Sequence, residues 1–157
     1  MSLFRRKPLV TWHVPEGRDD LVPRRATKHS MAYDLISPVD VTVPAVHPIL
    51  GVGSALINTL VAVTIPKKHA IVFRSRSGLA NKNGVTVEAG EIDFDYRGLL
   101  RVLLYNHSGK PYEIKAGDRI GQARFVKIYD LKERVSYEYP DTKETKRGAG
   151  GFGSTGK

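Results

Sequence analysis

Acidic residues are scarce in this chain, which has 16 Asp+Glu against 25 Lys+Arg, and several of them fall in one short stretch, residues 85–98. The carboxylates there belong to Glu88, Glu91, Asp93 and Asp95. The alternation of a strand would place the last three of these on the same side. They could supply a general base or hold a metal ion, or they could form a solvated hairpin tip. The neighbouring Gly90, Tyr96 and Gly98 favour a hairpin that lets a ligand approach its backbone.

A second group of residues suits an anion. Residues 74–80 read Arg-Ser-Arg-Ser-Gly-Leu-Ala, and we expect a strand here to lead into a short helix near Ser77 to Lys82, with Ser77 as its N-cap. The backbone N–H groups of a helix start, flanked by two arginines and two serines, could bind a phosphate. The alternative is an ordinary turn between two arginines.

The third candidate is the glycine-rich end of the chain, residues 147–157, which reads Arg-Gly-Ala-Gly-Gly-Phe-Gly-Ser-Thr-Gly-Lys. Glycine backbone N–H groups, two hydroxyls and an arginine could close over phosphates. A frayed terminus is the alternative, because so many glycines make the segment costly to order.

Other chemistries lack their residues. The chain has no cysteine, so disulfides, thiol nucleophiles and thiolate zinc sites are excluded. The five histidines are scattered, and no Gly-x-Ser-x-Gly motif is present. The net charge of +9 predicts a polyanionic partner, but it is spread as +4, +3 and +2 over residues 1–30, 31–130 and 131–157. A net charge spread this evenly along the chain is not typical of a basic DNA-binding arm.

The rest of the sequence predicts an all-β domain. Short apolar runs rich in β-branched residues are separated by Gly and Pro turns, which is typical of a sandwich or barrel. The expected strands are Val39 to Val43, Leu60 to Ile65, Ala70 to Phe73, Leu99 to Asn106 and Ile120 to Tyr129, with a further strand at Val135 to Tyr139. The uncharged stretch Val41 to Pro66 contains prolines, so we interpret it as loop plus strand and not as a membrane span.

In chain order, five segments resemble the signature segments of the homotrimeric deoxyuridine triphosphate nucleotidohydrolases (dUTPases). The segments are Ala32–Leu35, Arg76–Ala80, Gly90–Gly98, Gly117–Gln122 and Arg147–Gly156. The resemblance implies a distorted jelly-roll-like β-barrel with one short helix, a homotrimer with shared active sites, and a C-terminal glycine-rich arm. It also implies a division into a basic N-terminal extension at 1–30, a barrel core at 31–130 and, at 131–157, an arm that closes a neighbouring active site.

The implied reaction is hydrolysis of dUTP to dUMP and pyrophosphate with Mg²⁺. By resemblance, Asp93 activates the attacking water, Tyr96 packs on the deoxyribose, and Asp34 meets Mg²⁺ through water. The hairpin residues that match contacts to uracil are Val87, Gly90, Ile92 and Arg101. Those that match contacts to the phosphates are Arg76, Ser77, Gly78 and Gln122. Those that match the closing arm are Arg147, Phe152, Gly153, Ser154 and Thr155. We expect no membrane partner and no requirement for nucleic acid, and a cytoplasmic location (the host cell interior if the source is viral) without a secretion signal.

Two positions depart from the resembled pattern: Ser75 stands where proline is usual, and Gly121 stands where alanine is usual. We expect both to loosen the local backbone without touching a reacting group. The dCTP deaminase branch shares the barrel, but residues 99–106 lack the glutamate that it needs. A nonenzymatic binding protein would be expected to have lost motif residues such as Asp93 and Phe152, and these are present.

Overall fold

The computed structural model describes residues 9–47, 49, 51 and 53–150, and most of its regular structure is β-strand. The elements are β1 Thr11–His13, η1 Asp19–Leu21, β2 Tyr33–Ile36, β3 Val41–Val43, β4 Gly53–Asn58, β5 Ala62–Thr64, β6 His69–Arg74, α1 Ser77–Asn83, β7 Val85–Glu88, β8 Glu91–Ile92, β9 Arg101–Asn106, β10 Tyr112–Ile114 and β11 Arg119–Lys127. The expected all-β fold with one short helix is confirmed. No helix in this part of the chain is long and apolar enough to cross a membrane.

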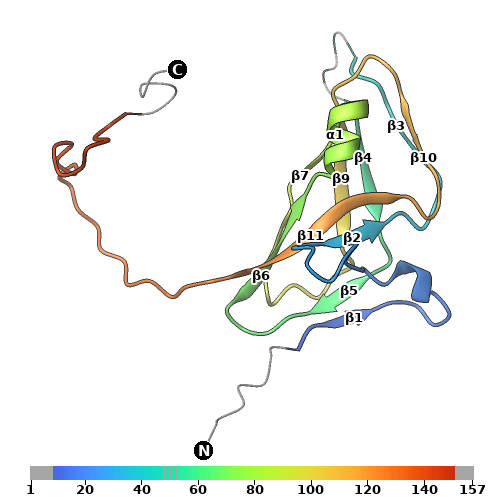
Figure 1. Cartoon of the computed structure of the whole chain (residues 1–157), viewed down its shortest axis with the longest axis horizontal. Helices are drawn as coiled ribbons and strands as arrows, with labels where there is room; N and C mark the ends of the chain where they lie inside the picture. The colour runs from blue at the N-terminus through green and yellow to red at the C-terminus, as the bar shows by residue number, and fades with distance from the viewer. Residues whose placement is uncertain (1–8, 48, 50, 52, 151–157) are drawn as a thin grey trace, which may run out of the picture.

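Four small sheets make up the body (Figure 1). The largest has the strand order β2-β11-β6-β8, and a second has the order β4-β9-β7. Two strand pairs, β1 with β5 and β10 with β3, complete the set. The strand pairs of the described residues are all antiparallel. Strand β11 is central because it pairs with β2 on one side and β6 on the other, which brings distant parts of the chain side by side.

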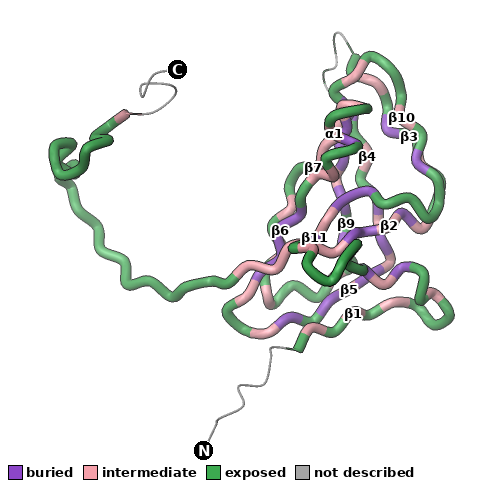
Figure 2. Tube along the Cα trace, viewed as in Figure 1, coloured by how far each residue is buried: buried purple, intermediate pink, exposed green. Residues whose placement is uncertain are grey.

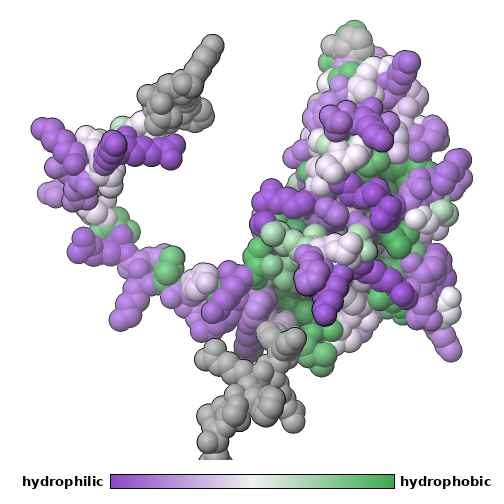
Figure 3. Space-filling view, viewed as in Figure 1, coloured by the Kyte–Doolittle hydropathy of each residue, from purple (hydrophilic) through white to green (hydrophobic). Residues whose placement is uncertain are grey.

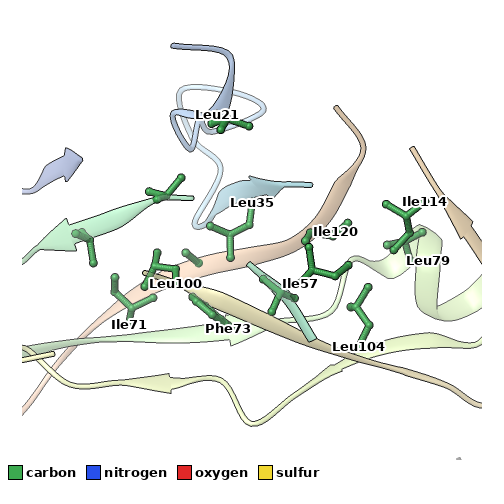
Figure 4. Close-up of a cluster of buried hydrophobic side chains, with 14 of the residues drawn as sticks. Leu21, Leu35, Ile57, Ile71, Phe73, Leu79, Leu100, Leu104, Ile114 and Ile120 are labelled. Carbon is green, nitrogen blue, oxygen red and sulfur yellow. The ribbon is translucent and has the colours of Figure 1, made fainter. Parts of the chain in front are cut away.

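The core is made by the inward-facing residues of these strands. In β9 the burial alternates, so that Val102 and Leu104 are fully buried while Arg101 is exposed. Apolar side chains from most elements meet in one cluster (Figure 4). Part of the segment expected as an N-terminal extension joins this cluster: β1 pairs with β5, and Leu21 is only 1% exposed.

Several local predictions were wrong. Ser77 does not cap α1, because the N-cap is Arg76 and no side chain makes a cap hydrogen bond there. The strand expected from Leu60 begins at Ala62, since Leu60 has a φ of 60°. Within the stretch Val41 to Pro66, the strands expected at Val39 to Val43 and at Leu60 to Ile65 correspond to β3 and β5, but β4 was expected as loop. The acidic stretch is a strand only as far as Ile92, so strand alternation does not extend to its last two carboxylates.

The segment after β11 leaves the body (Figure 1) and is exposed along its length up to residue 149 (Figure 2). The strand expected at Val135 to Tyr139 is not formed, because this segment has no neighbouring strand in the single chain. Its beginning is anchored on the turn before β6. The Ile128 N–H donates to the Lys68 carbonyl at 2.7 Å, and the Lys68 ammonium lies 2.7 Å from the Asp130 carboxylate, which raises the pKa of Lys68.

Candidate active site

The site is built around Asp34, a carboxylate only 6% exposed in the middle of β2. The strand register places Asp34 opposite Gln122 on β11, and the Gln122 Nε2 donates a hydrogen bond of 3.0 Å to Asp34 Oδ1. Arg119, at the start of β11, donates from Nη1 to Asp34 Oδ2 at 3.3 Å. A buried charge is costly unless it is paired and hydrogen-bonded, and both oxygens of Asp34 have a donor.

Arg76 adds the segment between β6 and α1 to this group. Its Nη1 donates to the Arg119 carbonyl at 2.8 Å, and its Nε lies 3.8 Å from Asp34 Oδ1. We call Asp34, Arg76, Arg119 and Gln122 the Asp34 cluster. Its two guanidinium groups outnumber its one carboxylate, so the cluster keeps a net positive charge. Arginine forks suit phosphate groups, so this cluster can receive a phosphorylated ligand.

A cavity of about 180 Å³ adjoins the cluster. Its lining combines polar groups and an apolar wall, from Arg76, Leu79, Tyr112, Ile114, Gly117, Asp118, Arg119 and Ile120. In the space-filling view, hydrophilic side chains lie among apolar patches on the face in which β11 and β2 lie (Figure 3).

The hairpin expected to read a base consists of β7 and β9, joined by a long connection that includes β8. Val87 lies opposite Leu104 in the β7–β9 pair, while Ile92 on β8 lies opposite Ile71 on β6. Gly90 lies against β6, where its carbonyl accepts from the Phe73 N–H at 2.7 Å. A Cβ on Gly90 would lie 2.5 Å from the Phe73 Cβ, so only glycine allows the connection to come this close.

Asp93 and Tyr96 lie on the turn that follows β8. The Tyr96 N–H donates to the Asp93 carbonyl at 3.2 Å, and the Tyr96 hydroxyl donates to the Leu99 carbonyl at 3.0 Å. A Cβ on Gly98 would lie only 2.3 Å from the Tyr96 hydroxyl oxygen, so Gly98 makes room for the ring. Asp93 is exposed and Tyr96 is 41% exposed, which leaves both available to a ligand.

Comparison with known proteins decides which family this arrangement belongs to. The family model described as dUTPase matches residues 20–156. The deoxyuridine 5'-triphosphate nucleotidohydrolase of Candida albicans is 43% identical over 145 residues, which is 91% of this chain and 84% of that protein. The chain belongs to the dUTPase family. Its fold agrees with this: the Staphylococcus bacteriophage 80alpha dUTPase with dUPNHPP superposes with a TM-score of 0.77 at 25% identity, covering 94% of this chain and 98% of that one.

In this member of the dUTPase family, the fold brings together three of the expected site residues. Asp34, Arg76 and Gln122 come from three separate segments and meet in the Asp34 cluster. Sequence reasoning missed the fourth member, Arg119. The only signal for it was its position inside the segment Gly117–Gln122, next to residues with an expected role.

Other expected site residues lie apart from that cluster. Within the described ranges, no hydrogen bond or ion pair joins Asp93 or Tyr96 to the Asp34 cluster. Arg101 is exposed at the start of β9, and Ser77 and Gly78 are exposed at the start of α1. Arg147 lies on the exposed C-terminal segment, where its Nε donates to the Gly150 carbonyl at 2.9 Å. Phe152, Gly153, Ser154 and Thr155 lie outside the described residues.

The carboxylates do not form a metal cage. No group of three or more His, Cys, Asp or Glu side chains in the described part of the chain could hold a metal ion. Asp34 is the single carboxylate of its cluster, and both of its oxygens already accept from a side chain. Mg²⁺ commonly keeps several waters and binds through one carboxylate plus substrate phosphates, and Asp34 fits that role. A mutant dUTPase of phage phi11 of S. aureus, 23% identical with a TM-score of 0.69 and covering 83% of this chain and 98% of that one, shows the coordination of a structural Mg(II) ion.

Proposed function

We propose that this chain hydrolyses dUTP to dUMP and pyrophosphate. The observation that carries the proposal is the Asp34 cluster, in which three segments of a dUTPase-family chain converge on one buried carboxylate beside two arginines. The water oxygen bonds to the α-phosphorus, and the bond from that phosphorus to the bridging oxygen breaks. Its electron pair leaves with pyrophosphate. Removal of dUTP limits uracil incorporation into DNA, and the product dUMP supplies thymidylate synthesis.

Asp93 accepts the proton of the attacking water. A general base must reach the water within hydrogen-bond distance, and the exposed Asp93 carboxylate is free of side-chain hydrogen bonds within the described residues. Tyr96 packs on the deoxyribose and leaves no room for a 2′-hydroxyl, so a ribonucleotide is excluded by a clash. The hydrogen bond from Tyr96 to Leu99 and the space left by Gly98 support this, because they hold the ring in one place.

The hairpin reads uracil with backbone groups. Val87, Gly90 and Ile92 provide main-chain contacts, and Arg101 lies on the returning strand. A closed backbone pocket rejects the thymine methyl group sterically. It also rejects cytosine, whose exocyclic amine is a donor where uracil has an acceptor, because buried unpaired polar groups are costly.

Arg76, Ser77, Gly78 and Gln122 bind the phosphates, and Asp34 meets Mg²⁺ through water. Bound Mg²⁺ would supply charge neutralisation on the phosphate oxygens. The chain's own part is to orient the triphosphate: the Arg76 guanidinium is fixed by the Arg119 carbonyl and faces the cavity beside the cluster. Oriented donors that need no rearrangement stabilise the charge that develops during phosphoryl transfer.

A homotrimer with shared sites accounts for features that a single chain leaves unexplained. In the part of the chain that the structure describes, no hydrogen bond or ion pair joins Asp93 to the Asp34 cluster, and we assign the completion of each site to a second copy. The sheet β4-β9-β7 carries Leu56 on its outer face at 58% exposure. The C-terminal segment exposes a row of apolar side chains, namely Tyr129, Leu131, Val135, Tyr137 and Tyr139.

Apolar groups this exposed call for a covering surface. We assign that surface to neighbouring copies of the chain, with the arm reaching another copy's site. Arg147, Phe152, Gly153, Ser154 and Thr155 then close over the nucleotide: Phe152 stacks on the uracil and the others meet the phosphates. Closure of this kind excludes water and completes the constellation of donors.

The position of attack can be tested with isotopically labelled water. Purified protein, Mg²⁺ and dUTP are incubated in H₂¹⁸O, the products are separated, and mass spectrometry measures the ¹⁸O content of each product. We expect one ¹⁸O atom in dUMP and none in pyrophosphate, because water attacks the α-phosphorus. Label in pyrophosphate would show attack at the β-phosphorus, and absence of products would reject the proposed function.

A further inference from the structure

The two positions at which the sequence departs from the resembled pattern, Ser75 and Gly121, both lie against the same residue, Val87. Ser75 follows β6 and directly precedes Arg76. Its Oγ accepts a hydrogen bond of 2.9 Å from the Val87 backbone N–H. Gly121 lies in β11, and a Cβ there would be 3.2 Å from Val87 Cγ2 and 3.4 Å from Val102 Cγ1. The two departures therefore meet at one point of the hairpin.

The Ser75 hydroxyl supplies an acceptor that the sheet does not. Strand β7 is at the edge of the sheet β4-β9-β7, so Val87 has a partner strand on one side only. An edge N–H that is shielded from water needs an acceptor from elsewhere, or its desolvation is uncompensated. The hydrogen bond to Ser75 meets this need and joins the hairpin to the segment that carries Arg76.

Gly121 provides space and not backbone freedom. It is buried, and it is absent from the glycines with positive φ. A methyl group at this position would press on the Val87 side chain at a distance tighter than most van der Waals contacts. The hydrogen bond to Ser75 therefore holds the Val87 backbone near the end of β6, and the absence of a side chain at Gly121 leaves space for the Val87 side chain beside β11.

We infer that Ser75 and Gly121 together are positioning residues that set the location and the polarity of Val87 in the base-reading hairpin. With its N–H committed to Ser75, Val87 can offer a ligand only its carbonyl oxygen. That acceptor matches the N3–H donor of uracil and opposes the N3 lone pair of cytosine. This inference rests on the proposed function, since it concerns how the same site recognises its base.

The test combines amide exchange with kinetics on the full-length protein. The variants are Ser75→Ala, Ser75→Thr, Gly121→Ala and the double variant Ser75→Ala/Gly121→Ala. Thr42→Val is the matched control, because it removes an exposed hydroxyl that donates to Glu113 in the separate β10–β3 sheet. NMR measures hydrogen exchange of the Val87 amide without nucleotide, and steady-state assays measure KM and kcat for dUTP.

In Ser75→Ala we expect faster exchange at Val87 and a KM for dUTP raised about five- to tenfold, the value of one lost hydrogen bond. The kcat should stay within about a factor of two, because the lost contact acts on binding. Ser75→Thr keeps the acceptor and should restore the wild-type KM. Gly121→Ala should also raise KM, and the double variant should depart from additivity because both changes act through Val87.

An unchanged KM in Ser75→Ala, or Val87 exchange equal to that of wild type, would overturn the inference. A lower melting temperature with unchanged kinetics would likewise overturn it, since Ser75 would then be merely structural. If the wild-type protein does not turn over dUTP at all, the proposed function fails. The Val87 exchange rates still decide whether Ser75 holds this amide.

Discussion

Gln122 on β11 lies directly opposite Asp34 on β2, and its side-chain amide donates a hydrogen bond of 3.0 Å to the Asp34 carboxylate. The register of two antiparallel strands therefore fixes the contact between residues that are far apart in the sequence. Because β11 also pairs with β6, the same strand brings the segment that holds Arg76 to this carboxylate. The site's charged centre is thus a direct product of sheet topology.

Replacement of Gln122 by alanine should destabilise the fold. Asp34 is buried, and loss of its Gln122 donor leaves a carboxylate oxygen undersatisfied, which costs about 1–3 kcal/mol. Urea unfolding measures the change, with Thr42→Val as the control that loses an exposed hydrogen bond. A Gln122→Ala protein no less stable than that control would contradict the role of this contact.

Gly98→Ala should weaken discrimination against ribonucleotides. The new methyl group would overlap the Tyr96 hydroxyl, so the ring must move from the place where we propose that it excludes a 2′-hydroxyl. We expect the ratio of kcat/KM for dUTP over UTP to fall about tenfold. Gly109→Ala is the matched control, because a Cβ at Gly109 meets nothing within 4 Å. An unchanged ratio in Gly98→Ala would mean that the Tyr96 ring does not set sugar specificity.

Asp93→Asn should abolish turnover and preserve nucleotide binding. Asparagine has nearly the same shape but cannot accept the proton of the attacking water, so kcat should fall about 100-fold or more. Calorimetry with a non-hydrolysable dUTP analogue measures binding. The control is Asp95→Asn, which changes an exposed carboxylate on the same turn. An active Asp93→Asn protein would remove Asp93 as the water activator.

Deletion of residues 147–157 should leave the proposed trimer intact and lower kcat more than about tenfold, because the proposed closure over the nucleotide is lost while the strands of the body are untouched. Light scattering measures the assembly, and steady-state kinetics measure kcat. Removal of Lys157 alone is the control. A monomeric truncation product would contradict the proposal that the arm is separate from the contacts that hold the trimer together.

The strands were largely predictable because they follow local chemistry. The apolar runs at residues 102–105 of β9 and 71–73 of β6 indicate strands without reference to the rest of the chain. The strand predictions that were wrong depend on contacts or backbone conformations set by the rest of the fold. Leu60 adopts a positive φ, and Val135 to Tyr139 lacks a partner strand in one chain, and neither condition is visible in a window of sequence.

Three of the four members of the Asp34 cluster were expected from the sequence, but the contacts that join them were not. The resemblance indicated Asp34, Arg76 and Gln122, yet Arg119 was missed because its contribution depends on both its guanidinium and its carbonyl group. Ser75 and Gly121 were expected only to loosen the local backbone without touching a reacting group. Their shared contact with Val87 arises from the approach of β7 to the end of β6 and to β11, which no spacing in the sequence reveals.

The central claim, that this chain is a dUTP-specific hydrolase, is tested most directly by its substrate preference. Pyrophosphate release is measured with Mg²⁺ on dUTP, dTTP, dCTP and UTP under identical conditions. Because we assign uracil selection to the hairpin and deoxyribose selection to Tyr96, dUTP should be hydrolysed far faster than the other three. Equal rates on dUTP and UTP, or no pyrophosphate from dUTP, would contradict it.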